Sequence, residues 1–197
     1  MKNRRNLWII VIVVIIAMIG FSAYSNYNSM VTKNEKVDEQ WSNVGTAYQR
    51  RADLIPNLVN TVKGYADFES KTLTAVIEAR AKATSVQVDP KNMTDADMKR
   101  FQDAQAGLSG SLSRLMVTVE QYPNLKANQN FLDLQSQLEG TENRISTERR
   151  KFNEMARDYN TFIRMFPKNI WSGMFKFDKK PYFEAAEGAD KAPAVKF

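Results

Sequence analysis

Hydrophobic residues recur at spacings of three and four along most of the chain after residue 30. Between Phe131 and Phe166, one hydrophobic series continues at every seventh position, and a companion series runs beside it. This spacing places apolar side chains on one face of an α-helix. The pattern predicts four helical segments and no convincing strand. The segments cover approximately residues 33–66, 68–84, 94–122 and 131–166.

Four amphipathic segments with short connections predict an all-α fold. We expect an up-down four-helix bundle with long antiparallel helices, which occupies residues 30–183. The small and polar residues 184–197 are expected to form a loose C-terminal tail.

Several residues predict where the helices bend, begin and end. Pro56 lies inside the first segment and is expected to kink it near Ala52, because the proline ring clashes with that carbonyl. Thr94 is a predicted N-cap, followed by acidic residues that favour the helix dipole. Pro123 and Pro167 are expected to end the third and fourth segments.

The start of the chain has a different pattern. Residues 7–24 are almost entirely apolar, and no charged residue lies between Arg5 and Lys33. A helix of this length measures about 27 Å, close to the roughly 30 Å core of a bilayer. Residues 7–24 therefore predict a transmembrane helix. Since the basic residues precede it, residues 1–6 form a cytoplasmic stub, and the bundle faces the periplasmic side of the inner membrane.

A cleaved signal peptide is the alternative interpretation of this leader. Residues 23–25 (Ala-Tyr-Ser) offer a small-x-small cleavage site. The apolar stretch of a signal peptide usually has only about 7–15 residues, which favours a retained anchor. A secreted, soluble bundle remains the alternative.

The composition excludes much familiar chemistry. The chain has no Cys and no His, which removes disulfides, thiolate metal sites, histidine catalysis and carboxylate-histidine di-iron sites. The net charge is +6, but residues 33–167 hold 19 basic and 18 acidic residues, so the predicted bundle is nearly neutral. That distribution argues against nucleic-acid binding. We expect no catalytic residue, cofactor or metal, and we expect the protein not to be an enzyme.

Two charged residues interrupt the predicted core, Arg51 in the first segment and Glu148 in the fourth. If the antiparallel helices align with Lys33 opposite Phe166, the two charges also lie opposite each other. We expect a buried ion pair that fixes the helix register, and removing Glu148 alone would then cost about 3–5 kcal/mol. A binding or proton site is the functional alternative.

The segment 168–183 is rich in aromatic residues and lysines and has two interpretations. Trp171, Phe175 and Phe177, beside four lysines, suit an interfacial patch on anionic lipid. Alternatively, the aromatic side chains close the base of the bundle and the lysines are simply solvated.

Several longer strings carry a family likeness. They are QRRADLIPNLVNTVKGY at 49–65, YPNLKANQNF at 122–131, LQSQLEGTENRI at 134–145, RDYN at 157–160 and FPKNI at 166–170. In these strings, and over most of its length, the chain resembles the bacterial LemA family. The resemblance implies a membrane-anchored, mainly helical protein whose LemA-like bundle spans residues 30–183. It implies no known reaction, cofactor or catalytic residue, and the lipoprotein cysteine of some relatives is absent here.

The predicted function is that of a binding or scaffold module at the cell envelope. The expected partners are the lipid bilayer and envelope proteins, and long heptads are also compatible with a homo-oligomer. The alternative from another class is an envelope enzyme that uses carboxylates alone. A concave site with two facing acids would favour the enzyme, and a solid core with an apolar surface groove would favour binding.

Overall fold

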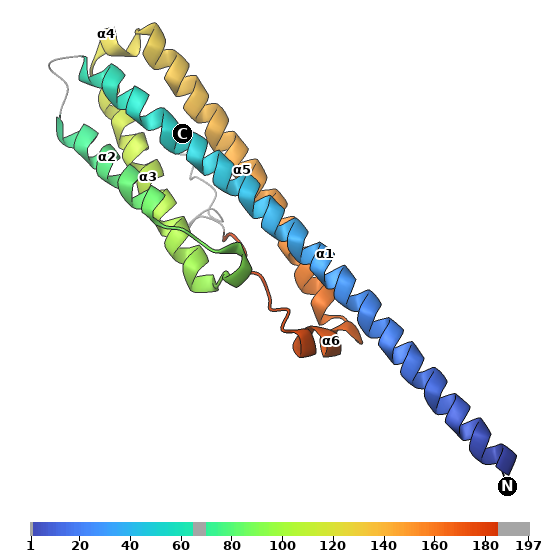
Figure 1. The fold of residues 1–197 in the computed structure, drawn as a ribbon. Coiled ribbons are helices and arrows are strands. Elements are labelled where there is room, and N and C mark those ends of the chain that lie inside the picture. The colour runs from blue at the N-terminus through green and yellow to red at the C-terminus, as the bar shows by residue number, and fades with distance from the viewer. Residues whose placement is uncertain (1, 65–69, 185–197) are drawn as a thin grey trace, which may run out of the picture.

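The computed structural model describes residues 2–64 and 70–184, and over these residues the protein contains helices and no strand (Figure 1). The predicted all-α class is therefore confirmed for the described chain. The helices are α1 (Lys2–Lys63), α2 (Ser70–Ser85), η1 (Pro90–Asn92), α3 (Asp95–Val119), α4 (Pro123–Lys126), α5 (Gln129–Arg164) and α6 (Lys168–Phe175). The C-terminal tail lies outside the described residues beyond Glu184.

Helix α1 is one uninterrupted helix of 62 residues, about 93 Å long. The sequence pattern suggested two elements, an apolar anchor and a separate first helix, but the structure joins them. From Leu7 to Phe21 the large apolar side chains are exposed, whereas from Met30 onward one face of the helix is buried. Figure 1 shows the N-terminal part projecting from the rest of the molecule. This part is long and apolar enough to be a candidate membrane span.

The second part of α1 and the other helices form what we call the helical body, residues 30–63 and 70–184. Within it, α1 packs closely along α5 and α2 packs along α3 (Figure 1). The buried side chains form two clusters. The distal cluster, near α4, includes Leu54, Leu58, Leu73, Val76, Leu108, Leu115, Leu125, Phe131 and Leu138. The proximal cluster, near α6, includes Val37, Trp41, Tyr48, Met98, Phe101, Ile145, Phe152, Tyr159 and Phe183.

The helix ends follow from capping residues. Thr94 caps α3 in a reciprocal capping box with Asp97, as its sequence predicted. Pro123 lies beyond the end of α3 and occupies the first turn of α4. Asn128 caps α5, where its side-chain oxygen accepts from the Phe131 backbone N–H at 3.1 Å. These residues fix the lengths of the helices that surround the core.

Pro56 lies inside α1, and the helix continues past it to Lys63. Because proline has no N–H, the carbonyl of Ala52 loses its normal helical donor. The Arg80 side chain of α2 supplies a substitute, since its Nε donates to the Ala52 carbonyl oxygen at 2.7 Å. The Ala52 carbonyl that Pro56 leaves without a helical donor thus accepts a hydrogen bond that holds α2 against α1.

The segment after α5 returns to the base of the helical body. Phe183 is buried and stacks on Trp41 at 5.8 Å between ring centroids, and Trp171 and Phe177 pack against the same proximal cluster. Lys180 is buried as well, and its Nζ lies 2.8 Å from Oδ1 of Asp38. The expectation that the aromatic side chains close the base is confirmed for Trp171 and Phe177, whereas Phe175 is 37% exposed. The expectation that the lysines are simply solvated is wrong for Lys180.

We predict that Arg80→Met destabilises the protein by about 1–3 kcal/mol, because the partly buried Ala52 carbonyl loses its donor. In a Pro56→Ala background the same substitution should cost clearly less, since the restored backbone N–H can reach that carbonyl. Chemical denaturation of the full chain in detergent, followed by circular dichroism, measures both values. Equal losses in the two backgrounds would contradict the assigned role of Arg80.

Candidate functional site

A polar layer separates the two apolar clusters, and Arg51 of α1 lies at its centre. The Arg51 side chain is only 1% exposed. Its Nη1 donates to Glu142 Oε1 at 2.6 Å and to Ser109 Oγ at 2.7 Å. Its Nη2 donates to Gln105 Oε1 at 2.6 Å, and its guanidinium carbon lies 5.2 Å from the centre of the Tyr48 ring. The buried charge is therefore paired with one carboxylate and hydrogen-bonded through both terminal nitrogens, whereas its buried Nε has no partner among the described residues.

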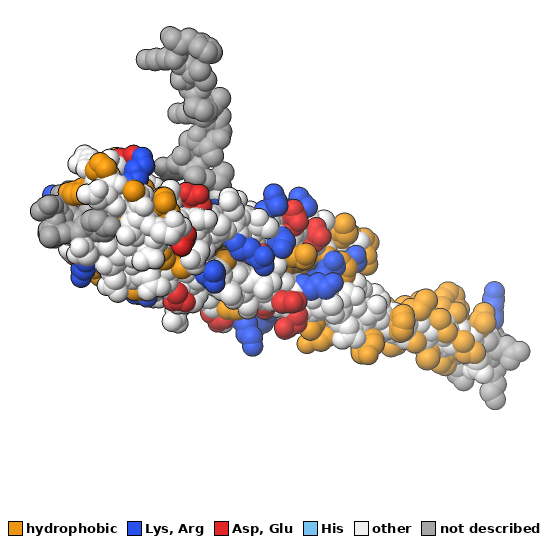
Figure 2. All heavy atoms as spheres, turned by 90° about the horizontal axis from the view of Figure 1, so that it is seen from above, with side chains coloured by type: hydrophobic (Ala, Val, Ile, Leu, Met, Phe, Trp, Pro, Cys, Tyr) orange, Lys and Arg blue, Asp and Glu red, His pale blue; other side chains and the backbone are white. Residues whose placement is uncertain are grey.

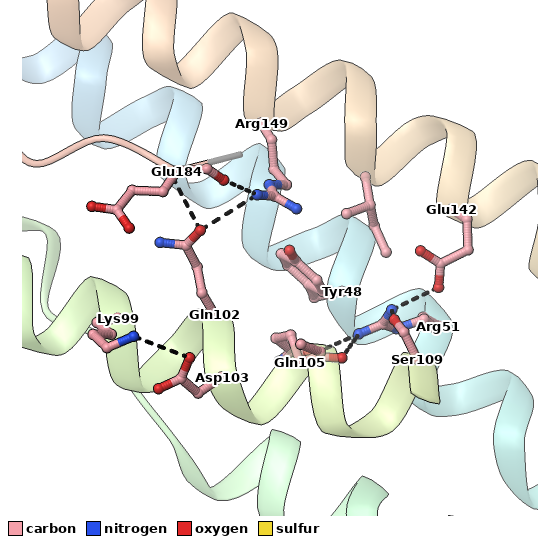
Figure 3. Close-up of a pocket in the computed structure, with 12 residues that line it drawn as sticks. Tyr48, Arg51, Lys99, Gln102, Asp103, Gln105, Ser109, Glu142, Arg149 and Glu184 are labelled. Atoms are coloured by element: carbon pink, nitrogen blue, oxygen red, sulfur yellow. Dashed lines mark hydrogen bonds and ion pairs between the residues drawn. The ribbon is translucent and has the colours of Figure 1, made fainter. Parts of the chain in front are cut away.

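The same layer connects all the long helices of the helical body. Gln105 of α3 accepts from Arg51 and donates through Nε2 to the Ala83 carbonyl of α2 at 3.1 Å. Glu142 contributes from α5. Figure 3 shows Arg51 between Gln105 and Ser109 on one side and Glu142 on the other. Since these contacts are directional, they define how the helices are aligned.

The predicted pair between Arg51 and Glu148 is wrong. Glu148 is buried, but it accepts from Gln40 at 2.8 Å and forms ion pairs with Arg144 and Lys151, at 2.7 and 3.4 Å. The carboxylate that binds Arg51 belongs to Glu142, six positions earlier on α5.

The reason for this error is the assumed register. The prediction aligned Lys33 with Phe166, whereas the Lys33 Nζ lies 5.3 Å from the ring centre of Phe162. Glu142 also stands outside the core series, and its side chain is 45% exposed. A long arginine can reach a carboxylate at the rim of a core, and the heptad pattern gives no signal for such a partner.

A cavity of about 500 Å³ opens beside the polar layer, between α1, α3 and α5 (Figure 3). Most of the residues that line it are polar, and the charged ones have both signs. Arg149 points toward the C-terminal segment, where Nη2 donates to the Glu184 carbonyl at 3.0 Å. The lining residues are Tyr48, Arg51, Lys99, Gln102, Asp103, Gln105, Ala106, Ser109, Glu142, Ile145, Arg149 and Glu184.

The electrostatics of the cavity favour binding over acid-base chemistry. Asp103 lies 3.7 Å from the Lys99 amine, and Glu142 is held by Arg51, so these two carboxylates each have a cationic partner. Burial raises the pKa of Tyr48, against the lowering influence of Arg149 and Arg51. Its phenol is therefore protonated at neutral pH and is no nucleophile. Among the described residues, no cluster of three or more Asp or Glu side chains could hold a metal ion.

A groove between α3 and α5 continues from the cavity toward the distal end. We call it the α3–α5 groove. It shares Ser109 and Glu142 with the cavity, and Leu112, Met116 and Leu138 supply its apolar surface. Ser113, Gln135, Glu139 and Asn143 complete its lining. The sequence analysis named no residue of this groove as a site, because heptad positions at its edge look like ordinary core residues.

A family model and several curated proteins match the sequence of this chain. The sequence model of the LemA family matches residues 40–197. The magnetosome proteins MamQ 2 of Paramagnetospirillum magneticum and MamQ of Magnetospirillum gryphiswaldense are each 26% identical over 181 residues, which is 83% of this chain and 66% of theirs. The chain thus spans just under two thirds of these curated relatives. Protein LemA of Metamycoplasma hominis is 24% identical over 160 residues, 81% of this chain and 69% of its own length.

We predict energetic coupling between Arg51 and Glu142 but not between Arg51 and Glu148. In a double-mutant cycle of unfolding free energies, Arg51→Met with Glu142→Gln should show coupling of about 1–2 kcal/mol. Arg51→Met with Glu148→Gln should be additive within about 0.5 kcal/mol, because the two side chains share no partner. The opposite result would restore the register predicted from the sequence.

We also predict that Glu148 makes stability depend on acidity. The hydrogen bond from Gln40, then Lys151 and Arg144, hold the pKa of Glu148 below its ordinary value of 4.5. A lowered pKa in the folded state stabilises the protein above pH 4.5, and this contribution is lost as the pH falls through the folded-state value. The difference in unfolding free energy between the wild type and Glu148→Gln should therefore shrink as the pH falls from 4.5 through the folded-state pKa of Glu148.

Chemical denaturation at a series of pH values measures this difference. The control is Glu154→Gln, at an exposed position of the same helix. An equal shrinkage in the control would mean that the effect does not come from the contacts of Glu148.

Proposed function

The chain belongs to the LemA family, and from this premise we propose that it is a single-pass membrane protein that carries a four-helix bundle as a binding or scaffold module at the cell envelope. The observation that carries the proposal is the continuity of α1. One helix supplies both the exposed apolar stretch from Leu7 to Phe21 and the buried residues Val37, Val44 and Leu58 of the core. The candidate anchor and the module are thus parts of one rigid element.

A retained anchor agrees with the way α1 packs. Tyr27 lies only three positions beyond Tyr24 and contacts the ring of Phe175 at 5.1 Å. The helix shows no break between the apolar stretch and the helical body. In the proposed orientation the basic stub lies in the cytoplasm and the bundle lies on the periplasmic side. A secreted bundle formed by cleavage near Ser25 is the alternative outcome.

The α3–α5 groove is the surface that we propose for a protein partner. Its apolar strip consists of the partly exposed Met116 and the edges of Leu112 and Leu138, which are otherwise buried in the distal cluster. Short polar side chains such as Ser113 and Asn143 flank this strip. An amphipathic helix of another envelope protein matches this chemistry, since it would place an apolar face on the strip and polar residues at the rim. The cation-bound carboxylates of the neighbouring cavity support a binding role more than the alternative of a carboxylate enzyme. A second copy of the chain is a further occupant that the experiment separates.

We predict that a photocrosslinking amino acid at Ser113 or Asn143, in the full chain in intact cells, captures a defined envelope protein. The matched control is Thr74, an exposed position of α2 outside the groove. Met116→Gln should abolish capture while circular dichroism stays unchanged. Protease added to spheroplasts should cut the helical body if it lies outside.

A different result would contradict each part of the proposal. Capture of only the protein itself would replace the scaffold role with self-association. Equal capture from Thr74 would remove the groove as the interface. A body that resists protease in intact spheroplasts but is cut after lysis would reverse the orientation, and recovery of a soluble form without the leader would show cleavage.

A further inference from the structure

The short helix α6 has an apolar face that the rest of the protein leaves uncovered. Ile170 and Met174 are four positions apart, on one side of the helix, and are 53% and 63% exposed. Phe166 lies two positions before the start of the helix and is 81% exposed. Large apolar side chains grouped in this way on a surface indicate an interaction site. We call Phe166, Ile170 and Met174 the α6 patch.

The opposite side of α6 is firmly attached to the helical body. Ser172 is buried, and its hydroxyl donates to the Ile163 carbonyl at 2.9 Å. Trp171 stacks on Phe175 at 6.3 Å between ring centroids. Trp171 also packs against the proximal cluster. The orientation of the helix is therefore fixed by these contacts, and the α6 patch faces outward as a consequence.

The α6 patch lies at the level where the candidate membrane span ends. Tyr27 of α1 contacts Phe175 at 5.1 Å and Phe177 at 5.7 Å. Tyr24 closes the apolar stretch, and Tyr27 lies about 4.5 Å further along the helix. Figure 2 shows hydrophobic side chains on the projecting helix and others at the adjoining end of the helical body, next to Lys and Arg.

The charges in α6 and directly after it are mostly positive, since residues 168–180 hold four lysines and one acid, Asp178. From Met165 to Phe177 the only charged residues are Lys168 and Lys176. The Nζ of Lys168 lies 4.0 Å from the ring centre of Phe162, so its charge stays beside the apolar surface. Apolar side chains accompanied by an excess of lysines match the interface of an anionic bilayer, where the rings and chains enter the acyl boundary and the amines meet phosphates.

We propose that α6 docks on the anionic lipid surface of the same membrane that α1 spans, so that the protein has a second, peripheral membrane contact. The continuity of the patch with the span and its positive charge favour lipid over a second copy of the chain. The sequence analysis proposed such a patch with Trp171, Phe175 and Phe177. In the structure the most exposed apolar side chains are other residues, because Trp171 and Phe177 pack inward and Phe175 is engaged by the rings of Tyr27 and Trp171.

This inference rests on the proposed membrane span, and one experiment separates the two. Because the chain has no cysteine, single cysteines can be labelled cleanly. We would introduce Met174→Cys, Ile12→Cys and Val117→Cys separately, attach an environment-sensitive fluorophore, and reconstitute the full chain in phosphatidylcholine vesicles with phosphatidylglycerol. Val117 is the matched control, since it is an exposed apolar residue on α3 at the distal end. Lipids with quenchers near the headgroup or deep in the acyl region report depth.

The labels at positions 12 and 174 should lose most of their fluorescence to deep and shallow quenchers respectively, and the label at 117 should be unaffected. Quenching at 12 without quenching at 174 would overturn α6 docking alone. Loss of quenching at 12 would overturn the membrane span. Two results together would assign the α6 patch to a second copy of the chain. The label at position 174 would be protected from water but unquenched by lipid, and unlabelled Met174→Cys would form disulfide-linked dimers.

The charge component has its own test. The substitution Lys176→Asn removes one charge. Asparagine tolerates the left-handed backbone at this position, where φ is 57°. Combined with Lys179→Gln, this substitution should weaken quenching at position 174 in anionic vesicles and leave it unchanged in pure phosphatidylcholine. Unchanged quenching in both kinds of vesicle would overturn the electrostatic part of the proposal.

Discussion

The buried guanidinium of Arg51 is the contact on which the arrangement of the helices depends. A charge in a protein interior is costly unless it is paired and hydrogen-bonded, so the helices must bring Glu142, Ser109 and Gln105 to it. Apolar heptads alone are compatible with several sliding registers, because one leucine packs much like the next. A directional polar layer selects one of them. The same polar side chains line the cavity beside the layer.

Local features of the chain were predictable from the sequence because they depend on near neighbours. The Thr94 cap and the helix stop before Pro123 require only a few residues of context. The burial of both Arg51 and Glu148 also followed from periodicity. Their partners did not, because pairing depends on how far α5 slides along α1. Heptad spacing repeats along both helices and therefore carries no absolute position.

Contacts between distant segments were the least predictable part of the structure. The sequence shows that Pro56 removes a hydrogen bond, but not that Arg80 replaces it. It shows aromatic residues and lysines after Pro167, but not that Lys180 turns inward to Asp38 while Met174 remains outside. These choices depend on where a short segment crosses the end of the helical body. The α3–α5 groove was missed for the same reason, since it arises from the spacing between helix pairs.

The uninterrupted α1 has a mechanical consequence. From Tyr24 to Lys63 it extends about 58 Å beyond the apolar stretch, so a tilt of about 10° at its base displaces its far end by about 10 Å. A change in bilayer thickness, or a pull on the distal tip, would thus be transmitted along a stiff rod instead of being absorbed by a hinge. In the proposed membrane arrangement, α1 would act as a lever that pivots at the lipid surface.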